Sequence, residues 1–113
     1  MPAGIQKRTF GPIALTNTLT TNVYNNTSAL IYDVIKHIHV ANKTGTAANF
    51  SLYLGATGTN AAGTELFYQV VVAGNSVFDW YGNLRMNSTD FLVGGSGTAT
   101  ALTIEGEGEQ FVV

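Results

Sequence analysis

Residues 33–54, DVIKHIHVANKTGTAANFSLYL, decide the predicted fold of this chain. In the first half of the stretch, Val34, Ile38 and Val40 fall on one face of an extended segment. A Phe-x-Leu-x-Leu pattern repeats the alternation over residues 50–54, and the Asn-Lys-Thr-Gly-Thr segment between the two halves is typical of a turn. The stretch therefore predicts a β-hairpin with one apolar side, which needs a second layer to cover it.

The rest of the chain repeats this kind of pattern. Short β-branched and aromatic runs alternate with Gly, Asn and Thr turns, and no window shows a helical period. A count of about seven to nine strands predicts an all-β fold, a single antiparallel two-sheet β-sandwich that is Ig-like or jelly-roll-like. We expect this domain to span residues 11–113, with an apolar C-terminal tip. Residues 1–10 show no pattern and are predicted to form an extended N-terminal arm, flexible or ordered by a partner.

The composition excludes several classes of function. Charged residues make up 11% of the 113-residue chain, against about 25% in an average soluble domain. The net charge of −2 and the five Lys and Arg residues argue against nucleic-acid binding. No apolar run approaches the ~18 residues of a membrane span. Few charges together with 45% hydrophobic residues favour a surface covered by neighbouring copies, that is, a homo-oligomer.

Two histidines, His37 and His39, are two residues apart and therefore lie on the same face of the predicted strand. Cupins place two metal ligands in this way, with a Glu four or five residues further on and another His downstream. Here Lys43 and Thr44 stand where that Glu would be, and the chain has no third His. A two-histidine site would have to recruit a carboxylate through folding, from Asp33, Asp79 or Glu65.

Three carboxylates, Glu105, Glu107 and Glu109, alternate with glycines near the C-terminus. In an extended chain they share a face that could bind a hard cation such as Ca²⁺. The commoner reason for such a run is a charged edge strand that discourages unwanted pairing. His37, His39, Glu105 and Glu107 are thus weak metal candidates, and we expect neither a metal nor another cofactor.

The chain carries no catalytic signature. Gly94–Gly97 lacks the Lys and the helix of a phosphate loop, and no Ser-His-Asp arrangement follows from the spacing. We therefore expect a protein that is not an enzyme. One alternative is a carbohydrate-binding β-sandwich module that uses Trp80 and Tyr81 as an aromatic platform.

Several short motifs in order resemble a known family. They are Ile-His-Val-Ala-Asn (38–42), Phe-x-Leu-x-Leu (50–54), Val-Ala-Gly-Asn (72–75), Ser-Thr-Asp-Phe-Leu-Val (88–93) and Gly-Glu-Gly-Glu (106–109). Over residues 33–109 the chain resembles small β-sandwich virion proteins of tailed bacteriophages, which serve as head decoration, collar or tail accessory components.

The resemblance implies a non-enzymatic structural subunit present in many copies. The expected role is a capsid decoration (cement) protein on the head shell, with a collar or tail accessory subunit as the alternative. Its partners would be copies of itself and other virion proteins such as the major capsid protein. Its location would be the virion, assembled in the host cytoplasm.

The attachment surface is expected near the two ends of the chain, over residues 11–26 and 109–113. Apolar side chains in these segments are the predicted partner contacts: Ile13, Leu15, Leu19, Val23, Tyr24, Phe111, Val112 and Val113.

Overall fold

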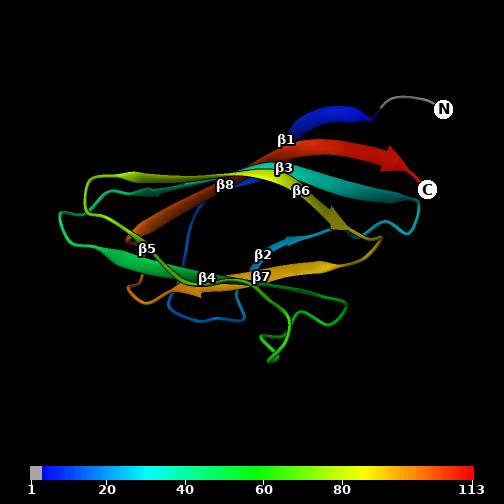
Figure 1. Ribbon diagram of the computed structural model, residues 1–113. Coiled ribbons are helices and arrows are strands. Elements are labelled where there is room, and N and C mark those ends of the chain that lie inside the picture. Colours follow the sequence, from blue (N-terminus) through cyan, green and yellow to red (C-terminus); the bar gives the residue numbers. More distant parts are fainter. Residues whose placement is uncertain (1–3) are drawn as a thin grey trace.

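A computed structural model describes residues 4–113, which form an all-β fold (Figure 1). Its eight strands are β1 (Ile5–Ala14), β2 (Asn22–Asn25), β3 (Ile31–Asn42), β4 (Ala48–Gly55), β5 (Glu65–Val72), β6 (Val77–Met86), β7 (Phe91–Ser96) and β8 (Leu102–Val112). No helix in residues 4–113 is long and apolar enough to cross a membrane.

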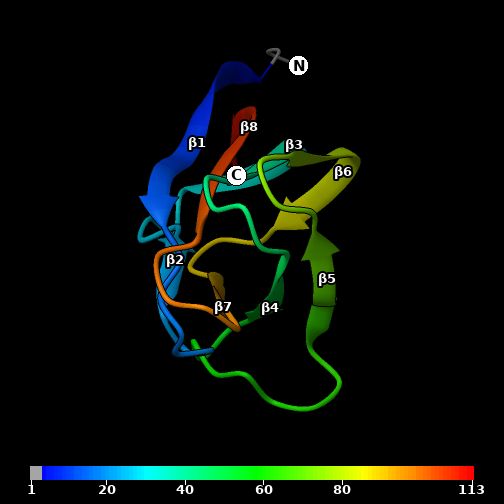
Figure 2. The same cartoon turned by 90° about the vertical axis from the view of Figure 1, so that its left-hand side faces the viewer.

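The strands form two antiparallel four-stranded sheets that pack face to face (Figures 1 and 2). We name them sheet A, with the order β1-β8-β3-β6, and sheet B, with the order β2-β7-β4-β5. This order is that of an eight-stranded jelly roll, in which successive strands pass from one sheet to the other, except that β4 and β5 are neighbours in sheet B. The predicted two-sheet sandwich is confirmed.

Residues 33–54 do not form the predicted hairpin. β3 pairs with β6 and β8 in sheet A, whereas β4 pairs with β5 and β7 in sheet B. The turn between them is an arch from one sheet to the other, held by the buried side chain of Asn42. Its amide donates hydrogen bonds to the carbonyls of Thr46 and of Val72 on β5, and its Oδ1 accepts from the backbone and hydroxyl of Thr44.

The core lies between the inner faces of the two sheets. Ile38, Val40, Phe50 and Leu52, all predicted to face inward, are completely buried. Val34 is only partly buried, and Ile35 takes the inward position instead. The reason is a β-bulge between Ile35 and His37, which shifts the register of β3 against β8 and reverses the alternation of faces.

The C-terminal Glu/Gly run and the N-terminal segment pair with each other, contrary to expectation. β8 is not an edge strand, because it pairs with β3 on one side and with β1 on the other. Residues 5–10, which fall within the predicted arm, form the first part of β1, with Ile5 opposite Gln110 and Phe10 opposite Gly106. Residues 1–3 of that arm lie outside the described residues. The backbone hydrogen bonds that β8 offers explain why this segment is ordered without a partner.

A buried carboxylate connects the two sheets at the start of β3. Asp33 is completely buried, and its Oδ2 accepts hydrogen bonds from the Tyr24 hydroxyl at 2.8 Å and from the Asn26 amide at 3.0 Å. Its Oδ1 accepts from the Gln110 amide at 3.3 Å. Tyr24 belongs to sheet B and Asp33 to sheet A, so this bond joins the layers. Burial of the phenol, together with its contact to Asp33, raises the pKa of Tyr24.

Replacing Tyr24 with Phe should lower the free energy of unfolding near neutral pH by about 1–3 kcal/mol, because the buried carboxylate of Asp33 loses a donor. The pH dependence should also change. Ionising Tyr24 is harder in the folded state, so the wild-type protein loses stability as pH rises above the ordinary tyrosine pKa of about 10. Chemical denaturation between neutral and alkaline pH should show a smaller alkaline loss for the Tyr24→Phe variant.

The matched control is Tyr81→Phe, since the Tyr81 side chain is 72% exposed. It should leave both the neutral stability and the alkaline loss as in the wild type. Equal behaviour of the two variants would show that the contact between Tyr24 and Asp33 contributes nothing to stability.

Candidate functional site

The histidine pair lies on the outer face of sheet A. His37 and His39 project from β3 on the side opposite Ile38 and Val40, which occupy the core. Their side chains are 19% and 37% exposed. The interior between the sheets is filled by apolar side chains at this point, so the pair does not form a site of the cupin kind there.

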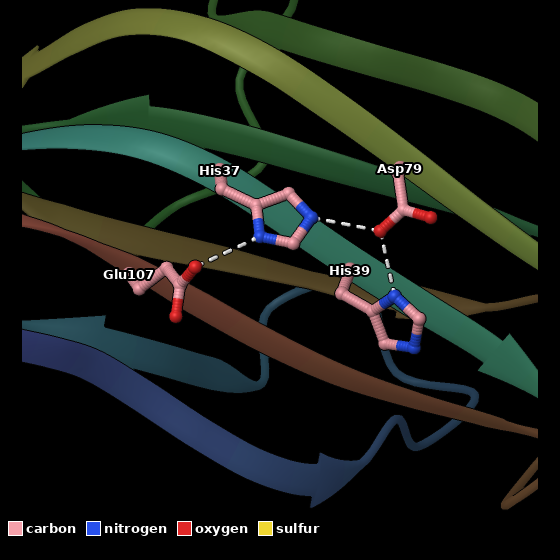
Figure 3. Close-up of polar contacts among 4 residues, drawn as sticks. All are labelled: His37, His39, Asp79 and Glu107. Atoms are coloured by element: carbon pink, nitrogen blue, oxygen red, sulfur yellow. Dashed lines mark hydrogen bonds and ion pairs between the residues drawn. The ribbon is translucent and has the colours of Figure 1, made fainter.

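An acidic residue of the neighbouring strand joins the two histidines (Figure 3). Asp79 on β6 lies opposite His39 in the sheet register. Its Oδ1 is 2.7 Å from Nε2 of His37 and 2.6 Å from Nδ1 of His39. A single carboxylate oxygen therefore accepts hydrogen bonds from both imidazole rings.

The other neighbouring strand contributes a second carboxylate. Glu107 on β8 lies opposite His37, and its Oε1 is 3.2 Å from Nδ1 of that ring (Figure 3). Tyr81 on β6 stacks on the same imidazole, with ring centroids 4.5 Å apart and planes only 3° from parallel. His37 is thus fixed at both nitrogens and on one face of its ring.

The carboxylates favour a charged His37. Partial burial lowers the pKa of this imidazole, but its hydrogen bonds to Asp79 and Glu107 and their negative charges outweigh burial, and the pKa lies above its ordinary value of 6.5. The hydrogen bonds that Asp79 accepts from His39 and His37 hold the pKa of this carboxyl below its ordinary value of 3.8. In the absence of other ligands, the group is an ionic network of imidazole and carboxylate.

The same atoms are suitable metal ligands. One nitrogen from each histidine and one oxygen of Asp79 all lie within 4.8 Å of one another. Two imidazoles and a carboxylate form a donor set that first-row transition ions accept. Of the three carboxylates considered from the sequence, folding brings Asp79 to the histidines, Asp33 is buried in its own hydrogen-bond network, and Glu65 lies at the start of β5.

The two glutamates considered as weak metal candidates differ in their positions. Glu107 contacts His37, whereas Glu105 lies opposite His39 in the register but does not belong to the group within 4.8 Å. Glu109 is 3.7 Å from the amine of Lys36, the residue at the bulge. Asp79, which contacts both histidines, is not one of the four residues that the sequence predicts as weak metal candidates. In the sequence, the alternation of Val77, Asp79 and Tyr81 predicts that the Asp79 carboxylate points outward. It does not predict which residues of the neighbouring strand the carboxylate contacts.

Glycines on both sides of Glu107 allow β8 to pass close to its neighbours. A Cβ at Gly106 would lie 2.3 Å from the ring of Phe10 in the core. A Cβ at Gly108 would lie 2.0 Å from the carbonyl oxygen of Val34, beside the bulge in β3. The Val34 carbonyl is part of the backbone, so it cannot move aside as the end of a flexible side chain can. The Glu/Gly alternation therefore places the acidic side chains outside while the strand lies close to its neighbours.

Replacing Gly108 with Ala should lower the free energy of unfolding by about 1–3 kcal/mol, because the added methyl group must displace the backbone of β3. The control is Gly55→Ala, at a site where a Cβ would meet nothing within 4 Å. This control should change the stability by less than about 0.5 kcal/mol. Thermal and chemical denaturation of both variants would test this, and equal stabilities would contradict the close approach at Gly108.

A hollow with a volume of about 500 Å³ adjoins the cluster. It is bounded by residues 6–8 of β1, by residues 107–109 of β8, and by Lys36, His37 and Tyr81. Lys7, Arg8 and Lys36 lie there together with Glu107 and Glu109, so neither sign of charge dominates its wall.

The predicted partner contacts fall into three groups. Leu15 is completely buried and Val23 is 7% exposed, both in the protein's own core, which corrects the expectation that they contact a partner. An apolar side chain at an inward strand position produces the same sequence pattern as one at an interface. Val112 and Val113 are 75% and 73% exposed and remain available. The other predicted contacts are partly buried: Ile13, Leu19, Tyr24 and Phe111.

The chain matches no protein-family model, and no curated protein shows significant sequence similarity to it.

Proposed function

We propose that this protein is a non-enzymatic structural subunit that assembles in many copies, most specifically as a decoration protein on the head of a tailed bacteriophage. The jelly roll is used by viral capsid proteins, and also by lectins and cupins. Because a fold alone does not determine function, the surface of this particular chain has to distinguish these classes.

The observation that carries the proposal is a set of exposed apolar side chains in two separate regions. The first, which we call the edge surface, lies along the neighbouring edge strands β5 and β6. Its exposed side chains leave the sandwich on the outer face of sheet B for β5 (Leu66, Tyr68 and Val71) and on the outer face of sheet A for β6 (Val77 and Tyr81), and they are between 41% and 72% exposed. The second, the terminal surface, comprises side chains between 66% and 75% exposed near the end of β8: Ile5, Leu30, Val112 and Val113. Large exposed apolar side chains that gather in this way are typical of interaction sites.

The edge surface also offers unpaired backbone. β5 is the outer strand of sheet B and β6 the outer strand of sheet A, and they lie on the same side of the sandwich (Figure 2). Edge strands present free N–H and C=O groups that a neighbouring chain can pair with. Natural monomers commonly protect such edges with charge, whereas β5 carries one charged residue, Glu65, at its very start.

Two unlike surfaces on one subunit favour assembly in many copies. A contact between the edge surface of one subunit and the terminal surface of the next would be heterologous, and such contacts produce rings or extended arrays. A decoration protein could instead use one surface for the shell and the other for its own copies. In both arrangements many modest contacts add up through multivalency.

The carbohydrate-binding alternative loses its proposed platform. Trp80 points inward and packs edge-on against Phe67, with centroids 5.8 Å apart and planes at 87°. Tyr81 points outward and stacks on His37. The two rings lie on opposite faces of β6 and cannot contact one sugar together.

The proposal is tested on particles produced from the genome that encodes this chain. Quantitative mass spectrometry of the purified particles should find the chain in many copies per particle. Replacing Tyr68 or Val71 with Lys should reduce the number of copies bound at a given concentration by about tenfold or more, since charge on a buried apolar contact is costly.

The matched control is Asn60→Lys, which adds the same charge in the exposed loop between β4 and β5. It should bind as the wild type does. Particles that hold only traces of the wild-type chain would refute the proposal, and equal occupancy by all the variants would refute the role of the edge surface.

A further inference from the structure

We propose that His37, His39 and Asp79 bind a divalent transition-metal ion on the outer face of sheet A, with Zn²⁺ as the best-matched ion. This inference does not depend on assembly into particles. It rests on the donor atoms, on the rigidity of the strands that carry them, and on a second carboxylate behind one of the rings.

The donor atoms converge without help from any loop. Nε2 of His37, Nδ1 of His39 and Oδ1 of Asp79 come from adjacent strands of one sheet, β3 and β6. Ligand atoms around a tetrahedral zinc ion lie about 3.3 Å apart, given bond lengths of about 2.0–2.1 Å. The contacts of 2.7 and 2.6 Å to Asp79 need to open by about 0.6–0.7 Å to reach this spacing.

Glu107 is a carboxylate outside the proposed ligand set that orients one of the ligating histidines, His37. A ligating histidine usually donates the N–H of its other nitrogen to a carboxylate, which fixes the tautomer and directs the free nitrogen to the metal. Oε1 of Glu107 is 3.2 Å from Nδ1 of His37, which leaves Nε2 facing Asp79 and His39. The stacked ring of Tyr81 holds the imidazole in the same orientation.

The solvent exposure of the cluster suits a metal ion that has one coordination position not filled by the protein. Asp79 is 31% exposed and His39 37% exposed, so an ion can enter from solvent. Three protein ligands leave the fourth position of a tetrahedral ion for water or for a group of a neighbouring molecule. The donor set of two nitrogens and one oxygen disfavours Ca²⁺ and Mg²⁺, which prefer oxygen ligands.

The test is calorimetric titration of the full, tag-free chain with Zn²⁺ alone at slightly alkaline pH, where the proton competes least. One ion should bind per chain. The Glu107→Gln variant should bind about 10- to 100-fold more weakly, as is usual when a carboxylate that orients a ligating histidine is lost. Asp79→Asn and His39→Asn should lose more affinity than Glu107→Gln, because each removes a direct ligand.

The matched control is Glu109→Gln, which removes the same charge two residues along β8, where Glu109 contacts Lys36 instead. It should retain the wild-type affinity. A wild-type chain that binds no Zn²⁺, or a Glu109→Gln variant that loses as much affinity as Glu107→Gln, would overturn the proposal. Circular dichroism of each variant would check that the sandwich is folded.

A measurement on the wild-type chain keeps the test independent of the variants. Nitrogen-15 spectra of the imidazoles should show His37 bound to Zn²⁺ through Nε2 and His39 through Nδ1. Binding of either ring through its other nitrogen would contradict the geometry. Unchanged imidazole spectra on saturation with Zn²⁺ would overturn the proposal.

Discussion

The pairing of β3 with β8 through the middle of sheet A is the constraint on which the rest of the structure depends. It runs from Ile31 opposite Val112 to Asn42 opposite Leu102, with one shift at the bulge before His37. That shift turns both histidines outward, where β8 presents carboxylates and β6 presents Asp79. Beside this bulge, β8 must have no side chain at residue 108, and Gly108 meets this requirement. One irregularity in β3, which shifts its register against both β8 and β6, thus produces both the core alternation and the outer cluster.

The two proposed roles use different parts of the same sandwich. The outer face of sheet A carries the polar cluster, and the edge surface and terminal surface carry the exposed apolar side chains. Tyr81 belongs to both, because it stacks on His37 and is 72% exposed on β6. A neighbouring molecule that covers the edge surface would therefore also approach the proposed metal ion. Low overall charge is consistent with contacts that rely on apolar area and backbone pairing.

The sequence predicted the strands and many of their inward-facing residues correctly, but it did not predict which strands pair with each other. Alternation identified the strands and the inward positions of Ile38 and Phe50, because burial on one face has a period of two. It predicted a hairpin where the chain crosses between sheets, because the pattern of one strand does not specify its partner. The bulge beside Lys36 was likewise not predictable, since a single extra residue leaves no mark in composition. Asp79 could be named as a recruit for the histidines, but only the register of β3 and β6 places it there.

Diffraction at the zinc absorption edge, from crystals of the full chain grown with Zn²⁺, tests the central claim most directly. The geometry predicts one anomalous peak per chain, about 2.0–2.2 Å from Nε2 of His37, Nδ1 of His39 and a carboxylate oxygen of Asp79. Such a peak would also verify the register of β3 with β6 and the outward orientation of the histidines. A peak at other residues alone, or no peak at an otherwise ordered cluster, would contradict the account.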